Sequence, residues 1–182
     1  MSFVPSDSVP GPTASTSESA GFDSKHFRSV LGHFPTGVTI VTGLYEGRPA
    51  GFTIGSFTSI SLDPPLVGFF PMIASETWAA MAPFGNFCVN VLRDTQGDLC
   101  WRFAKTGVDD GRFDDVAWTP SPTGCPVLEG VGAWIDCRVA ESIELGDHFL
   151  VVGEVVALDH HDQAHVPLVF YRGALGGFAS SN

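Results

Sequence analysis

Two long β runs in the second half of the chain constrain its fold most. Residues 131–143 and 148–158 both read as strands, and only the turn Glu144-Leu145-Gly146-Asp147 separates them. A short glycine-containing turn between two such runs predicts an antiparallel hairpin. The chain's 21 glycines, 13 prolines and 15 phenylalanines also fit a β-rich body with many turns better than a helical bundle.

Shorter elements complete this picture. Breakers such as Asp63-Pro64-Pro65 separate further predicted strands, which cover residues 38–44, 48–54, 56–62, 66–70, 86–92 and 167–172. Three short helices are expected as well: one capped by Asp23 or Ser24 and carrying Phe27, Val30, Leu31 and Phe34 until residues 32–35 end it, one from Ser75 through Met81, and one over 95–104. The predicted class is β-rich (α+β), with an antiparallel barrel, closed or half closed, and a few short peripheral helices.

Domain organisation follows from length and local composition. A chain of 182 residues most often holds one domain with one core. Residues 1–22 are rich in Ser, Thr, Pro and Gly and predict a disordered N-terminal tail. We expect the domain to cover residues 23–178 and a short C-terminal tail to cover 179–182.

Charge narrows the range of partners. The formal net charge is −11, and only nine basic residues are scattered between Lys25 and Arg172, which argues against nucleic acid and anionic membranes as ligands. Small molecules are the expected partners. The sequence has neither a signal-peptide pattern nor an apolar run long enough for a membrane span, so a soluble cytoplasmic protein is expected.

Cysteine and histidine patterns do not predict a metal site. Each of Cys88, Cys100, Cys125 and Cys137 stands in apolar sequence without a C-x-x-C spacing, which favours buried thiols over a disulfide or metal framework. His160, His161 and His165 lie in a polar segment without a helix to align them, and we reject a metal centre there.

Nucleotide-binding loops of the usual kinds are missing, but an ordered set of other motifs is present. It comprises residues 34–42, S-F-T-S-x-S-L-x-P-P-L-V at 56–67, N-F-x-V-N-V-L at 86–92, R-F-A at 102–104, Gly146-Asp147-His148 and P-L-V-F-Y-R-G at 167–173. With these motifs, the chain resembles the flavin reductase family over roughly residues 27–178. Members of that family serve flavin-dependent monooxygenases.

The resemblance implies an FMN-binding split β-barrel, usually a homodimer. It implies an NAD(P)H:flavin oxidoreductase that binds FMN or FAD and uses NADH or NADPH, with hydride passing from nicotinamide C4 to flavin N5. The reduced flavin would diffuse to a separate monooxygenase component. Two alternatives stay open, because fold does not decide activity: a split-barrel protein that binds flavin or haem without reductase activity, and a structural partner of an oxygenase.

The resemblance assigns the flavin ring to two segments. The first contributes Thr53, Ser56, Phe57, Ser59 and Ser61, whose short hydroxyls can approach a ring edge closely; strand alternation would put Phe57, Ser59 and Ser61 on one face. The alternative is a solvent-facing strand edge. The second segment is Thr36-Gly37-Val38-Thr39, which the residues alone read equally well as a helix-to-strand turn. Gly55 stands where many relatives carry asparagine, which puts one ring contact in doubt.

Phosphate binding is assigned by the same resemblance to residues 74–77, with Ala74, Ser75 and Thr77 at a helix start. A simple capping box at Ser75 is the alternative. Arg102, Phe103 and Lys105 belong to the same expected site, and a solvated helix face competes with that interpretation.

His148 is the predicted catalytic residue. The resemblance places this histidine near the nicotinamide, where it would hydrogen-bond the carboxamide or pyrophosphate. Asp147 is expected to shape the turn rather than take part in chemistry. Tyr171 would line the far side of the same pocket, although an aromatic residue at a strand end is ordinarily part of a core.

Overall fold

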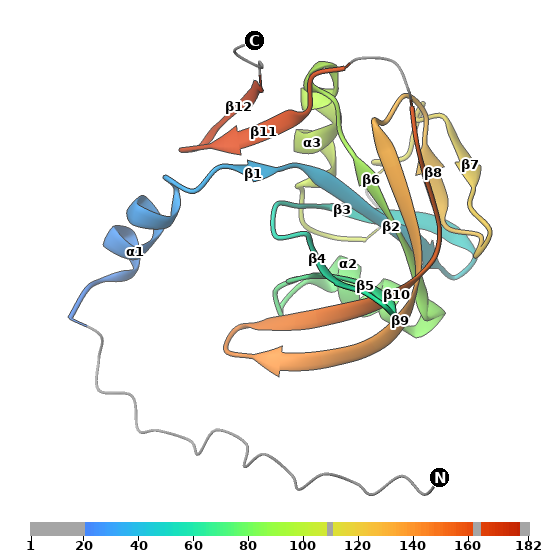
Figure 1. Ribbon diagram of the computed structural model, residues 1–182, viewed down its shortest axis with the longest axis horizontal. Helices are drawn as coiled ribbons and strands as arrows, with labels where there is room; N and C mark the ends of the chain where they lie inside the picture. The colour runs from blue at the N-terminus through green and yellow to red at the C-terminus, as the bar shows by residue number, and fades with distance from the viewer. Residues whose placement is uncertain (1–20, 109–110, 162–164, 179–182) are drawn as a thin grey trace, which may run out of the picture.

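The computed structural model describes residues 21–108, 111–161 and 165–178. The predicted tails lie outside these residues except for Gly21 and Phe22. Figure 1 shows a curled sheet with short helices at its margin and one helix, α1, standing away from the body.

The helices are α1 (Ser24–Leu31), α2 (Glu76–Met81) and α3 (Gly97–Phe103), with 3-10 turns at Ala82–Phe84 and Asp94–Gln96. The strands are β1 (Thr36–Gly37), β2 (Thr39–Tyr45), β3 (Arg48–Ile54), β4 (Thr58–Leu62), β5 (Pro65–Phe69), β6 (Asn86–Val91), β7 (Trp118–Pro120), β8 (Pro126–Leu128), β9 (Ala133–Leu145), β10 (His148–His160), β11 (Leu168–Tyr171) and β12 (Ala174–Gly177).

The main sheet has seven strands in the order β3-β2-β6-β9-β10-β5-β4. Its two edge strands, β3 and β4, are consecutive in the chain and are joined only by residues 55–57. Such a link reaches about 14 Å at most, whereas the edges of a flat sheet of this width lie about 29 Å apart. The sheet must therefore curl until its edges approach each other. The result is the predicted antiparallel barrel, split at the seam between β3 and β4 (Figure 1).

The hairpin expected from the sequence forms the longest part of this barrel. β9 and β10 pair from His148–Leu145 to His160–Ala133. Gly146 turns the chain with a φ of 65°, a conformation that costs glycine little. Two register shifts, next to Gly153 and between Val155 and Ala157, bend the hairpin and let it close the barrel.

Two clusters of buried residues form the core. The larger one includes Phe52, Phe69, Trp78 and Phe87, and the smaller one includes Phe103 with residues from β2 and β8. Between the strands, the fully buried Asn90 donates from Nδ2 to the carbonyl of Ile40 at 3.2 Å and accepts from the amide of Leu128 at 2.8 Å. The second asparagine of the N-F-x-V-N-V-L motif thus attaches β8 to the barrel.

The helix α1 begins at its predicted cap, since Asp23 Oδ1 accepts from the amide of His26 at 2.7 Å. None of its residues is buried, and it leads into the small sheet β1-β11-β12 (Figure 1). Its apolar side chains, Phe27, Val30 and Leu31, are about half exposed, and Phe34 just beyond it is 74% exposed. The apolar face that predicted this helix therefore lies uncovered in the single chain.

Some sequence predictions were wrong in detail. The helix expected over 95–104 is a 3-10 turn followed by α3, and the strand expected from Ser56 begins at Thr58 because Ser56 and Phe57 belong to the seam. A register shift between Ser59 and Ser61 interrupts the alternation that was expected to put Phe57, Ser59 and Ser61 on one face. Four short strands, β1, β7, β8 and β12, were not predicted. Among the described residues, no helix has the length and apolar character needed to cross a membrane.

Candidate functional site

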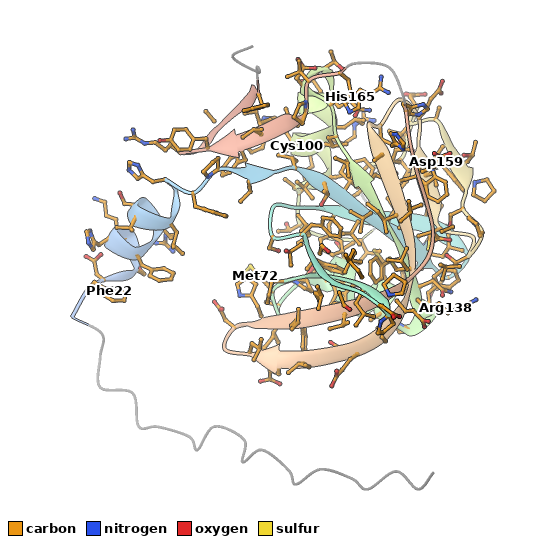
Figure 2. All side chains as sticks on the ribbon, viewed as in Figure 1. Phe22, Met72, Cys100, Arg138, Asp159 and His165 are labelled. Atoms are coloured by element: carbon orange, nitrogen blue, oxygen red, sulfur yellow. The ribbon has the colours of Figure 1, made fainter. Side chains whose placement is uncertain are left out.

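The main cleft opens at the seam of the barrel. It has a volume of about 610 Å³ and is lined by five segments of the chain: the end of β3, the link to β4, the end of β5 with the start of α2, the end of α3 with the loop after it, and the first residue of β10. At the seam, the end of β3 and the link after it are available to a ligand, whereas β4 contributes no lining residue. Figure 2 shows Met72, one of the lining residues, on the side of the body from which α1 projects.

Aromatic rings support the cleft from within. Phe52 lies in its wall and contacts Phe69 and Trp78, with ring centroids 6.1 and 6.4 Å away. Phe69 is fully buried and meets Trp78 edge to face at 5.3 Å. Phe70 and Phe103 add further ring surface to the lining. A planar apolar group could therefore lie against a rigid wall.

Hydroxyl groups in the lining are held by backbone partners. Ser56 Oγ accepts from the amide of Phe70 at 3.0 Å and so joins the seam to the end of β5. Thr53 Oγ1 donates to the carbonyl of Cys100 at 2.7 Å, which attaches β3 to α3. Each hydroxyl keeps lone-pair capacity for a ligand, but its position is fixed by these bonds.

Another wall of the cleft combines the start of α2 with the loop after α3. Ser75 caps α2 by accepting from the amide of Trp78 at 3.2 Å. The buried Thr77 donates from Oγ1 to the carbonyl of Gly107 at 2.7 Å and so holds the loop against the helix. Lys105 in that loop lines the cleft and supplies a positive charge. This wall can receive an anionic group.

His148 lies where β10 begins, and its position is set by the backbone on both sides. The amide of Phe149 donates to the carbonyl of Pro71 at 2.9 Å, and that of Ile73 donates to the carbonyl of Asp147 at 3.0 Å. His148 Nδ1 lies 2.6 Å from Asp147 Oδ1, and this hydrogen bond lowers the pKa of the Asp147 carboxyl. An ionised carboxylate only accepts, so Nδ1 carries the hydrogen and Nε2 of the neutral ring is the acceptor.

The structure brings together half of the residues that the sequence assigned to the site. Those that line the cleft are Thr53, Gly55, Ser56, Ala74, Ser75, Thr77, Phe103, Lys105 and His148. Those outside its lining are Thr36, Gly37, Val38, Thr39, Phe57, Ser59, Ser61, Arg102 and Tyr171. Thr36 is nevertheless a close neighbour, because a Cβ built on Gly55 would lie 3.0 Å from its hydroxyl oxygen. An asparagine in place of Gly55 would require Thr36 to move.

Two of the residues outside the cleft lining, Arg102 and Tyr171, have contacts elsewhere in the chain. Arg102 donates from Nη1 to the carbonyl of Asp114 at 2.8 Å and borders a separate hollow with Asp98 and Glu129. Tyr171 meets His33 edge to face at 6.3 Å, on the small sheet beside α1. Both places lie away from the main cleft within one chain.

Sequence reasoning missed the other lining residues, which are Phe52, Ile54, Phe70, Pro71, Met72, Glu76, Ala104, Thr106 and Gly107. Most of them flank residues that were assigned, so proximity in sequence was the available signal. It also missed Arg112, a buried residue that donates hydrogen bonds to the loop after α3, at the Gly107 carbonyl among others. An arginine within an acidic, glycine-containing loop gave no sign of burial.

The cysteines are buried free thiols, as expected. Burial raises the pKa of Cys125 and Cys137 to about 12, and it raises that of Cys88 and Cys100 as well. Thiolate chemistry is therefore suppressed at neutral pH. Among the residues that the structure describes, no group of His, Cys, Asp and Glu is placed to hold a metal ion.

Curated relatives cover most of this chain. The family model described as "Flavin reductase like domain" matches residues 31–179. A flavin reductase of Pseudomonas putida is 44% identical over 164 residues, which are 88% of this chain and 94% of that protein. The reductase subunit HsaB of a flavin-dependent monooxygenase, from Mycobacterium tuberculosis, is 44% identical over 160 residues, 87% of this chain and 84% of that one.

Solved structures give the same result. Nitrilotriacetate monooxygenase component B from Mycobacterium thermoresistibile superposes with a TM-score of 0.81 at 43% identity, over 85% of this chain and 86% of that chain. An NADH:FAD oxidoreductase from Streptomyces globisporus, solved in complex with NAD and FAD fragments, superposes with a TM-score of 0.80 at 34% identity, over 87% of this chain and 94% of that chain. The agreement in both sequence and fold covers the part of the chain that builds the cleft.

Proposed function

Because this chain belongs to the family of flavin reductase like domains, we propose that its seam cleft binds FMN or FAD and that the protein is an NAD(P)H:flavin oxidoreductase. The observation that carries the proposal is the construction of the cleft. It places aromatic walls, anchored hydroxyls, the Lys105 ammonium and the His148 imidazole around one opening of about 610 Å³. These groups match a ligand with a flat ring, a polar rim and an anionic tail.

The residues present fit such a ligand by their chemistry. Phe52, Phe70 and the seam backbone would cover and border the ring, while the Thr53 and Ser56 oxygens are held at its rim. Ser75, Thr77 and Lys105 form the wall suited to the phosphate. When both cofactors are bound, nicotinamide supplies hydride from C4 and flavin accepts it at N5. The protein's part is to orient the two rings and exclude water between them.

His148 has the geometry of a residue that orients the nicotinamide. Its Nδ1–H is held by Asp147, so Nε2 is free to accept a hydrogen bond from a carboxamide in the cleft. We expect His148→Gln to raise KM for NADH about tenfold, the value of one hydrogen bond to a poised acceptor. The KM for flavin should stay within about twofold, since the phosphate wall is not altered.

The decisive assay mixes the purified protein under air with each pairing of NADH or NADPH with FMN or FAD, and follows nicotinamide absorbance. Oxidation that depends on added flavin is the expected result. A protein that binds flavin but leaves NADH and NADPH unchanged would overturn the proposal and favour a flavin-binding module. Running all pairings also identifies the preferred flavin and nicotinamide.

Relatives named as the reductase subunit or as a component of a monooxygenase extend the proposal to a partner. We infer that the product, reduced flavin, is released to a separate monooxygenase component. Release requires weak binding of reduced flavin, which a cleft open at a barrel seam permits. Stopped-flow mixing with the oxygenase would reveal flavin transfer; a flavin that never leaves between turnovers would contradict it.

The cytoplasmic location expected from the sequence belongs to the same proposal, because the nicotinamide pool is there.

A homodimer is also proposed, and its support is the uncovered helix α1. Phe27, Val30 and Leu31 are each about half exposed although they form the apolar face of the helix. A second copy would bury that face. Light scattering should give twice the 19.3 kDa mass of one chain. Leu31→Glu should shift the protein toward monomer, whereas Ser29→Glu on the polar face of α1 should not.

A further inference from the structure

Arg112 is a buried cation that is not among the residues proposed to bind flavin. It lies in the segment between α3 and β7 and is only 3% exposed. Its guanidinium donates to four backbone carbonyls: Gly51 at 2.7 Å, Lys105 at 3.2 Å, Thr106 at 3.5 Å and Gly107 at 2.6 Å. A buried charge is stable only when its donors are satisfied, so these bonds join β3, through Gly51, to the loop of Lys105, Thr106 and Gly107.

Three of those carbonyls belong to one wall of the cleft. Lys105, Thr106 and Gly107 all line it, and they lie in neither a helix nor a strand. Among the described residues, their carbonyls accept no hydrogen bond from the backbone. The loop is held instead by Arg112 and by Thr77, which shares the Gly107 carbonyl at 2.7 Å. Among the described residues, removal of the guanidinium would leave the Thr77 hydroxyl as the side-chain attachment of this loop.

The same bonds orient the loop. A trans peptide points its carbonyl and its amide hydrogen in opposite directions. Because the carbonyls of Lys105 and Thr106 face the guanidinium, the amides of Thr106 and Gly107 face away from it. Gly51, the fourth partner, directly precedes the cleft residue Phe52 on β3. Arg112 thereby sets the distance between the Lys105 wall and the wall that supports the ring.

We propose that Arg112 is a positioning residue for recognition of the flavin phosphate, acting through the loop of Lys105, Thr106 and Gly107. This inference depends on the proposed function, in which flavin occupies the cleft with its phosphate toward that loop and Thr77. Arg112 does not touch the flavin. It holds a lysine and two backbone amides where an anion can meet them, and it does so from behind the wall.

The test compares two ligands that differ only in the phosphate. Dissociation constants for FMN and riboflavin are measured by flavin fluorescence in wild type, Arg112→Met and Arg112→Lys, together with kcat and KM for FMN. Arg112→Met should weaken FMN binding about tenfold, or about 1.4 kcal/mol. Riboflavin binding and kcat at saturating FMN should change less than about threefold. Lysine keeps a charge and three donors, so Arg112→Lys should weaken FMN binding less than methionine does.

Arg138→Met is the matched control. It also removes an arginine, but Arg138 is exposed on β9 and does not line the cleft, so its variant should bind FMN like wild type. Thermal unfolding without flavin shows which variants fold. If Arg112→Met does not fold, Arg112→Lys decides the matter by weakening FMN more than riboflavin.

Two results would overturn the inference: unchanged FMN binding in Arg112→Met (or in Arg112→Lys if the methionine variant does not fold), or equal losses for FMN and riboflavin. Failure of the proposed function looks different, because the wild-type protein would then bind neither ligand, or would bind flavin without oxidising NADH or NADPH.

Discussion

Gly153 in β10 is expected to tolerate no side chain, because the ring of Phe87 occupies the space beside it. A Cβ built on Gly153 would overlap Phe87 Cζ, lie 2.8 Å from Phe87 Cε1 and lie 3.0 Å from Cys137 Cβ. Phe87 is fully buried and meets Phe69 edge to face at 5.1 Å, so its ring has little room to turn away. Gly153→Ala therefore overpacks the larger core cluster.

The magnitude follows from two opposing effects. Overpacking by one methyl against a rigid ring costs about 3 kcal/mol, the upper end of the usual range. Replacing a glycine by alanine also restricts the unfolded chain, which returns about 0.5–1 kcal/mol. The free energy of unfolding should fall by about 2 kcal/mol, and for a chain of this length the melting temperature should fall by about 4–8 °C.

Urea unfolding at one protein concentration measures this effect, since self-association would otherwise change the midpoint. Gly176→Ala is the control: it also lies in a strand, but nothing approaches its built Cβ within 4 Å, so its midpoint should not fall. In the double variant Gly153→Ala, Phe87→Leu, the loss of unfolding free energy should be about 1 kcal/mol smaller than the sum of the losses in the two single variants. A Gly153→Ala protein as stable as Gly176→Ala would refute the packing argument.

Three further predictions concern the cleft, the thiols and the hairpin turn. Thr77→Val removes the hydroxyl that donates to Gly107 at 2.7 Å, so the free energy of unfolding, measured in urea, should fall by about 1 kcal/mol; an unchanged value would mean that the bond is not formed. Because burial raises the thiol pKa values, to about 12 for Cys125 and Cys137, Ellman's reagent at pH 8 should leave the native thiols unmodified and react with all four only in denaturant; rapid native reaction would contradict their burial. The hydrogen bond from His148 lowers the pKa of Asp147, so its stabilising effect is present above the ordinary aspartate pKa and is lost as pH falls through the folded value. Carbon-13 NMR should accordingly find Asp147 titrating at higher pH in His148→Gln, and an identical titration would exclude the bond in solution.

Local signals were sufficient for many of the elements. The Asp23 cap begins α1 as predicted, and β3 has the predicted bounds, Arg48–Ile54. The hairpin turn could be predicted because the sequence places a glycine, Gly146, where the chain adopts a positive φ. These features depend on residues a few positions apart, and sequence patterns report such interactions directly. The family motifs added the split barrel and the approximate location of the site.

Contacts between residues far apart in the sequence decided which hydroxyl side chains line the cleft, a point that the sequence pattern left open. The hydroxyl-rich stretch predicted a ligand rim, yet the structure turns Thr53 toward the Cys100 carbonyl and Ser56 toward Phe70, while Ser59 and Ser61 stay outside the cleft lining. No local rule distinguishes these serines and threonines, because the partners of Thr53 and Ser56 lie on other elements.

The chain by itself therefore determined its longer strands, its hairpin turn and a β-rich class, since backbone preferences and hydrophobic alternation act over a few residues. Closure of the sheet placed the seam, brought the loop after α3 close to β3 and buried Arg112 between them. Those features arise from contacts between segments far apart in sequence, and only the packed barrel makes such contacts.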